Sequence, residues 1–417
     1  MRALPWILAG ILCHMSAAPV AAPLSLPEAE ALALMHDRQA VAYEAGAQAR
    51  REQAVAAAQL PDPSLKLGIA NLPVESFDRS DTPMSQLQVG VRQRFPPGRT
   101  LALAGQREER LAAGLSARAE LRRREVLREL RRSYLEVYYQ TRAGWILDET
   151  YRLFEDLVDT TRAYYGAGRK NQQDVLRAGV ELSLLDDRRD RVRTRLETAR
   201  AELARLVGPE AVQRPLAEEF PEPPALSAPE AMQRALDRHP QLQRASEQIA
   251  AGRLGVAVAR ERYKPGWSLD VTYGERNGRE ADGSGRSDLL SAMVVVDLPL
   301  FTDKRQDRML AARQYELNAV EYEREELRRE LHEQLEAARA EWERLQARLA
   351  RYRERLLPEA SQHAEASLKA YQSGVSDFTA LMRARLIELD ARLTALRLRT
   401  DLAQTAARLR YLVGEES

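Results

Sequence analysis

The apolar positions of this chain follow two periods, and the longer one predicts helices of unusual length. From Thr100 to Tyr165 apolar side chains recur every three or four residues, and a second stretch has the same spacing. The seam positions are Leu127, Leu130, Tyr134, Val137 and Thr141 in the first stretch and Leu331, Leu335, Ala338, Trp342, Leu345, Leu349, Tyr352 and Leu356 in the second. A 3.5-residue period is typical of a coiled coil. The first helix would be about 100 Å long, which suits a rod or a tube.

The shorter period is a strict alternation, and it predicts two strand pairs within residues 64–95 and 268–301. Strands of about ten residues with one apolar face are typical of outer-membrane barrels. The positions expected to face lipid are Leu67, Val89, Val91, Val271, Val294 and Val296. Arg92 and Asp270 belong to the opposite, polar face. The alternative is two amphipathic hairpins that pack on a soluble core.

Four strands are too few to close a barrel, because the smallest closed examples have about eight. An open strand edge cannot lie in lipid, where every backbone polar group needs a partner. We therefore expect copies of the chain to pool their strands under closed cyclic symmetry. Three copies with four transmembrane strands each would supply twelve strands.

The chain also repeats its own plan. The segment "LSLPEAEALAL" at 24–34 resembles "LSAPEAMQRAL" at 226–236, and one common offset relates Gly168 to Gly374 and Gly208 to Gly414. In each repeat we expect a helix (about Pro27–Leu60 and Pro229–Tyr263), a strand pair, a long helix, a glycine tip and a return helix. The expected divisions are a first repeat at 23–208, a proline-rich connector at 209–225, a second repeat at 226–414 and a tail at 415–417.

The first 22 residues are interpreted as a secretory signal peptide. Arg2 supplies the positive charge, Leu4 to Cys13 form the apolar region, and small residues follow up to a cleavage point near Ala22. Cys13 is the only cysteine, and Leu12 before it is not the small residue that lipid modification requires. The mature chain therefore has no disulfide and no thiolate metal site. No later segment is apolar over the length of a transmembrane helix.

Composition and charge exclude several classes of function. Charged residues make up 30% of the chain and aromatic residues 6%, a mixture typical of long helices. The formal net charge of +1 indicates no nucleic-acid partner. No catalytic triad, nucleotide-binding loop or metal-ligand spacing is present, so we expect no enzyme activity, no cofactor and no metal site. The remaining rival is a periplasmic adaptor or coiled-coil scaffold, which would carry one helical hairpin rather than two.

The sequence resembles the TolC-like outer-membrane efflux channels, which are also called outer membrane factors. The resemblance runs from Pro27 to Gly414. It rests on the two tips, "YYGAG" followed by "DVLRA" and "YQSG" followed by "LMRAR", on the two strand pairs and on the ends "RLVG" and "YLVG".

The resemblance implies a mainly α-helical homotrimer whose barrel lies in the outer membrane of a Gram-negative bacterium. Long antiparallel coiled-coil helices would extend the channel through the periplasm, where the tips dock a periplasmic adaptor (membrane fusion protein) bound to an inner-membrane RND-type pump. The residues expected to contact the adaptor are Gly168, Arg169, Gly374, Val375 and Ser376. Members of this family carry acidic residues at the positions of Ala380 and Arg383, so this sequence departs from the pattern, and we expect the periplasmic constriction to be set by Arg383 with Asp174 or Asp377.

The sequence indicates the exported cargo less directly than it indicates the fold. The first hairpin, with "NLP", "SF", "PM" and "QRFPPG" in order, is most similar to the branch that accompanies heavy-metal efflux pumps. The five His and eight Met are scattered, so no coordinating role is expected for them. The prediction is a channel for metal ions. A drug, organic-solute or type I secretion channel of the same fold is the alternative.

Overall fold

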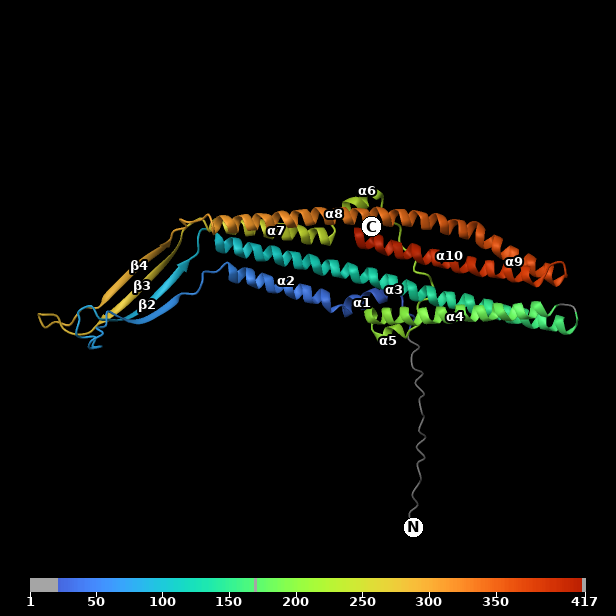
Figure 1. The fold of residues 1–417 in the computed structure, drawn as a ribbon, viewed down its shortest axis with the longest axis horizontal. Helices are drawn as coiled ribbons and strands as arrows, with labels where there is room; N and C mark the ends of the chain where they lie inside the picture. The colour runs from blue at the N-terminus through green and yellow to red at the C-terminus, as the bar shows by residue number, and fades with distance from the viewer. Residues whose placement is uncertain (1–21, 169–170, 415–417) are drawn as a thin grey trace, which may run out of the picture. The chain divides into compact units, whose positions relative to one another are not determined.

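The computed structural model describes residues 22–168 and 171–414 and shows the same order of elements twice (Figure 1). The predicted signal peptide, except for its last residue, and the tail at 415–417 lie outside the described residues. The first series comprises α1 (Leu26–His36), α2 (Arg38–Ala57), β1 (Ser64–Ala70), β2 (Gln86–Phe95), α3 (Thr100–Gly166), α4 (Gln172–Val207) and α5 (Pro209–Val212). The second comprises α6 (Pro229–Leu236), α7 (Pro240–Glu261), β3 (Gly266–Arg276), β4 (Leu289–Asp297), α8 (Gln306–Arg351), the π-helical segment η1 (Tyr352–Leu356), α9 (Leu357–Gln372) and α10 (Phe378–Val413).

The chain packs into two compact units, and each takes residues from both series. The hairpin unit draws its described residues from Met1–His36, Leu130–Glu222 and Glu359–Thr400. The sheet unit draws them from Asp37–Glu129, Pro223–Pro358 and Asp401–Ser417.

The predicted seam of the second long helix is confirmed over most of its length. Leu331, Leu335, Leu345 and Leu349 are buried. Leu356 is 42% exposed, so the prediction is wrong there. The reason is the π-helical segment that ends at this residue, since an extra residue in one turn moves the apolar stripe to a new face. Pro358 follows directly, and its ring and missing N–H disturb the preceding turn.

The first helix of each series is broken, whereas the sequence predicted one continuous helix in each place. Asp37 separates α1 from α2, with φ −73° and ψ 99°, and its carboxylate accepts a hydrogen bond from the Ala40 N–H at 3.0 Å. This side-chain cap competes with continuation of the helix. Residues 237–239 separate α6 from α7, and Pro240 begins α7, since a proline disfavours helical backbone at the residue before it.

His239, the residue before this proline, is fully buried in the sheet unit. Its Nδ1 accepts a hydrogen bond from the Gln241 N–H at 3.3 Å, and its ring packs edge-on against Tyr411 with centroids 5.3 Å apart. Burial, together with the positive charges of Arg124 and Arg128, lowers the pKa of His239 to about 4. The imidazole is therefore neutral at neutral pH.

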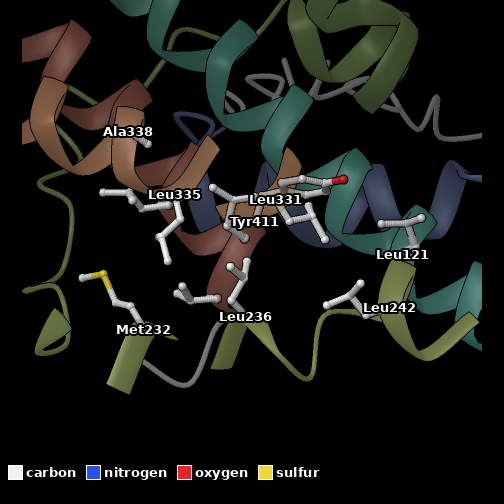
Figure 2. Packing of buried hydrophobic residues seen from close by; sticks show 11 residues of the cluster. Leu121, Met232, Leu236, Leu242, Leu331, Leu335, Ala338 and Tyr411 are labelled. Carbon is white, nitrogen blue, oxygen red and sulfur yellow. The ribbon is translucent and has the colours of Figure 1, made fainter. Parts of the chain in front are cut away.

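The core of the sheet unit includes one face of α6 (Figure 2). Met232 and Leu236 from α6 pack with Leu331 and Leu335 from α8 and with Leu121 from α3. A second core lies in the hairpin unit, and its buried residues include Leu147, Phe154, Leu157, Leu185, Tyr371, Phe378, Leu381 and Leu389. The long helices are thus amphipathic, as the 3.5-residue period predicted.

The proline-rich connector packs against the hairpin unit. Leu24 accepts a hydrogen bond from the Ala217 N–H at 3.1 Å and donates its own N–H to the Pro215 carbonyl at 2.8 Å. Phe220 is buried edge-on against Tyr138, with ring centroids 5.3 Å apart. Beyond α5, which opens the connector, these contacts rather than regular secondary structure hold it in place.

The strands form one antiparallel sheet in the order β1-β2-β3-β4. The first strand pair was predicted with its observed bounds. The second begins two residues earlier than expected, at Gly266, and ends at Asp297 rather than near Phe301. Pro299 explains the early end, since it lacks the N–H that a ladder needs.

Candidate functional site

Both glycine tips end a helix with a glycine of positive φ. Gly168 has φ +67° and Gly374 has φ +77°, values that favour glycine because it lacks a Cβ. Gly374 donates its N–H to the Tyr371 carbonyl at 3.1 Å, and Val375 donates to the Ala370 carbonyl at 2.9 Å. This pair of bonds is the Schellman motif of a helix C-terminus. The sequence had predicted positive φ at both glycines, and this is confirmed.

The tips also lie side by side within the hairpin unit. The rings of Tyr164 and Tyr371 have centroids 6.5 Å apart, and Tyr371 packs edge-on against Phe378 at 5.8 Å. Beyond the tips, the Arg177 guanidinium donates a hydrogen bond to the Thr379 hydroxyl at 3.0 Å, which ties α4 to α10. Sequence reasoning missed this aromatic contact, although a tyrosine precedes each glycine tip.

The residues expected to contact an adaptor differ in their surroundings. Val375 is 83% exposed, an unusual environment for a branched apolar side chain. Gly168 and Gly374 are exposed as well, and a Cβ on either would meet nothing within 4 Å. Ser376 is half-buried. Arg169 lies outside the described residues.

The three residues expected at a constriction lie near the tips but do not pair with one another. Asp377 accepts a hydrogen bond from the Ala380 N–H at 2.7 Å, so its carboxylate caps the N-terminus of α10. Asp174 is half-buried in the first turn of α4, and Arg383 is exposed on α10. Within residues 22–168 and 171–414, no ion pair or hydrogen bond joins their side chains.

The sheet separates apolar from polar side chains along β1, β2 and β3 as the alternation predicted, whereas on β4 Met293 and Val295 lie on the polar face. The ladder places Leu65, Val91 and Val271 in one cross-strand row and Leu67, Val89 and Tyr273 in the next. All six positions predicted to face lipid carry exposed side chains in the single chain: Leu67, Val89, Val91, Val271, Val294 and Val296. At one end of this face Phe95 stacks on Trp267 with ring centroids 3.9 Å apart.

The opposite face of the sheet holds an ion cluster around one buried carboxylate. Asp270 is 2% exposed, and the Arg92 guanidinium donates to its Oδ2 from Nε at 2.9 Å and from Nη2 at 2.8 Å. Lys66 forms an ion pair with the same oxygen. Thr272 donates its hydroxyl to Oδ1 at 3.3 Å. The sequence had assigned Arg92 and Asp270 to this face but gave no role to Lys66.

The described residues contain neither a membrane-spanning helix nor a cluster of metal ligands. No helix there is long and apolar enough to cross a membrane. No group of three or more His, Cys, Asp or Glu side chains in the same part of the chain is placed to hold a metal ion.

Comparison with known proteins identifies the fold. Residues 231–415 match the family model described as "Outer membrane efflux protein". The structure is similar to the outer-membrane channel OprN, with TM-score 0.78, 19% identity, and coverage of 93% of this chain and 89% of the other. VceC from Vibrio cholerae has TM-score 0.77, 18% identity, and coverage of 93% and 96%. CusC has TM-score 0.78, 15% identity, and coverage of 93% and 92%. No curated protein sequence is significantly similar to the chain.

Proposed function

We propose that this protein is the outer-membrane channel of a tripartite efflux system. The observation that carries the proposal is the similarity of fold, since 93% of the chain superimposes on OprN, VceC and CusC. The match of residues 231–415 to an efflux protein family points the same way. In this function the chain gives exported solutes a passage from an inner-membrane pump through the periplasm and the outer membrane.

The sheet supports the membrane part of the proposal. Its apolar face would be costly in water, because contiguous exposed apolar patches of this kind mark contact with lipid or protein. Its edge strands β1 and β4 have unpaired edges in the single chain, and lipid does not satisfy backbone polar groups. A homotrimer that joins β4 of one copy to β1 of the next removes both problems and yields a closed barrel.

The tips support the periplasmic part. Two exposed tips in each chain would present six helix ends in a trimer, where a periplasmic adaptor could dock. Gly168, Gly374, Val375, Ser376 and Arg169 are proposed to make that contact. Asp174, Asp377 and Arg383 are proposed to line the nearby constriction.

The proposed cargo is metal ions, on the resemblance of the first hairpin to channels that accompany heavy-metal pumps. A drug or organic solute is the alternative cargo of the same channel. The pump, rather than a site in this chain, would select the cargo.

The test is membrane extraction followed by transport. Membranes are washed in high salt and then extracted with detergent, and the extract is analysed by light scattering. We expect the protein to resist the wash and to run as a trimer in detergent. Cells lacking the gene should retain more of the exported metal or drug than cells that carry it. Release by salt as a monomer would support a periplasmic scaffold and contradict the proposal.

A further inference from the structure

The polar face of the sheet carries more positive than negative charge. Small residues such as Gly68, Ser268 and Gly274 lie on this face among larger ones, which include Arg94, Arg276 and Met293. In the cluster around Asp270 two cations, Lys66 and Arg92, share one carboxylate. The sum of these formal charges leaves one positive charge without a balancing acid.

The geometry shows which of the two cations lacks a balancing negative charge. Arg92 is directly opposite Asp270 in the ladder, and two of its nitrogens donate to one carboxylate oxygen. Such charge-assisted hydrogen bonds are strong, so Arg92 is the stronger of the two partners of Asp270. Lys66 lies on β1, which is not adjacent to β3, so its side chain must cross β2 to reach Asp270. The lysine is 38% exposed, whereas the carboxylate is almost completely buried.

Gly90 makes this crossing possible. It is the residue of β2 paired with Lys66 on one side and with Thr272 on the other. A Cβ at position 90 would lie 2.5 Å from the Thr272 hydroxyl oxygen and 2.9 Å from the Val271 carbonyl oxygen. Thr272 therefore closes this space to a Cβ, and Lys66 reaches Asp270 past a residue of β2 that has no side chain.

We propose that Lys66, held over Gly90 by its ion pair with Asp270, is a charge-selectivity residue that favours anions over cations in the channel. This inference rests on the proposed function, in which the polar face lines the lumen. Asp270 holds the ammonium group against the wall, and Arg92 neutralises Asp270, so the field of Lys66 extends into the aqueous path. The effect concerns ions that diffuse passively, because a pumped cargo is driven.

The size of the effect follows from Coulomb's law. One unit charge about 4 Å from a monovalent ion in water is worth about 1 kcal/mol, which changes the local ion concentration by about fivefold. Salt screens this interaction, so the preference should be largest at low ionic strength. We therefore expect a chloride-to-potassium permeability ratio above one that decreases as salt rises.

The experiment is a reversal-potential measurement on the full-length trimer in planar lipid bilayers, with a potassium chloride gradient. The variants are Lys66→Met and Lys66→Glu, and the matched control is Lys304→Met, which removes an exposed lysine outside the sheet. We expect Lys66→Met to shift the reversal potential toward that of potassium, Lys66→Glu to shift it further, and Lys304→Met to leave it at the wild-type value.

The outcomes separate this inference from the proposed function. If the wild-type trimer conducts but both Lys66 variants keep its reversal potential, the selectivity role of Lys66 is wrong. The proposed channel function is then still supported. A conducting wild-type trimer that prefers potassium also overturns the role. A trimer that gives no conductance at all contradicts the proposed function, and the inference falls with it.

Discussion

Tyr164 and Tyr371 lie with their ring centroids 6.5 Å apart, although more than two hundred residues of sequence separate them. Each precedes one of the glycine tips. The Tyr371 hydroxyl is also 3.4 Å from the Thr161 hydroxyl, and its ring is 97% buried. The two tips are therefore not independent turns, because one aromatic cluster joins them inside the hairpin unit.

Removal of this cluster should loosen both tips together. Replacement of Tyr371 by alanine should cost about 3–5 kcal/mol, the range for a large buried aromatic side chain. Hydrogen exchange should then accelerate at the ends of both α3 and α9. The matched control is Tyr165→Ala, since this neighbouring ring is 46% exposed. Faster exchange at only one tip would contradict the coupling.

Gly374→Leu tests whether the tips bind a partner. The new side chain would meet no atom within 4 Å of its Cβ, so the cost is the positive φ alone, about 1 kcal/mol. We expect normal trimer yield but loss of adaptor cross-linking and of efflux. Gly179→Leu is the control, because Gly179 also has open space around it but lies within α4 without a positive φ. Wild-type efflux in Gly374→Leu would mean that the tips are only turns.

The sequence predicted the elements whose signal is periodic. The ladder pairs Leu67 with Val89 and Val91 with Val271, which brings together residues that the alternation had placed on one face. Likewise Leu331, Leu335 and Leu349 are buried because a 3.5-residue period puts them on one side of the helix. Because such a pattern repeats over many residues, it predicts the buried face of a helix or strand without any knowledge of the segments that pack against it.

The sequence did not predict features that depend on one residue or on a distant partner. Asp37 breaks a helix through a single side-chain hydrogen bond, and Pro358 follows a π-helical turn that shifts the seam. The contact between Tyr164 and Tyr371 and the reach of Lys66 to Asp270 both join segments far apart in the chain. The spacing of apolar residues within one segment does not predict contacts between distant segments.

The two valines at positions 294 and 295 test the orientation of the sheet. They are neighbours on β4 with opposite faces, and each is exposed in the single chain, by 60% and 40%. If the apolar face contacts lipid, Val294→Arg should cost about 2–4 kcal/mol near the bilayer midplane. Val295→Arg, the control on the polar face, should assemble normally. Heat stability of the trimer on gels measures the difference, and an equal loss in both variants would mean that the faces are assigned wrongly.

His239 should make the protein sensitive to acid. Its pKa is about 4 in the folded chain, against 6.5 for an ordinary histidine, because burial and the charges of Arg124 and Arg128 disfavour the imidazolium. A depressed histidine pKa means that the unfolded chain binds the proton first as pH falls. The stability from neutral His239 is therefore complete above pH 6.5 and is lost toward pH 4, by about 2 kcal/mol at pH 5.

His239→Asn isolates this contribution, since asparagine can cap α7 as the imidazole does but does not titrate. The packing lost against Tyr411 lowers stability at every pH. The comparison therefore concerns how steeply the unfolding midpoint changes with pH, and not its absolute value. We expect the unfolding midpoint of the wild-type protein to fall between pH 7.5 and pH 5 by more than that of the variant. The measurement is thermal unfolding in detergent, followed by tryptophan fluorescence at four pH values. Parallel curves for the two proteins would show that His239 does not carry the acid sensitivity.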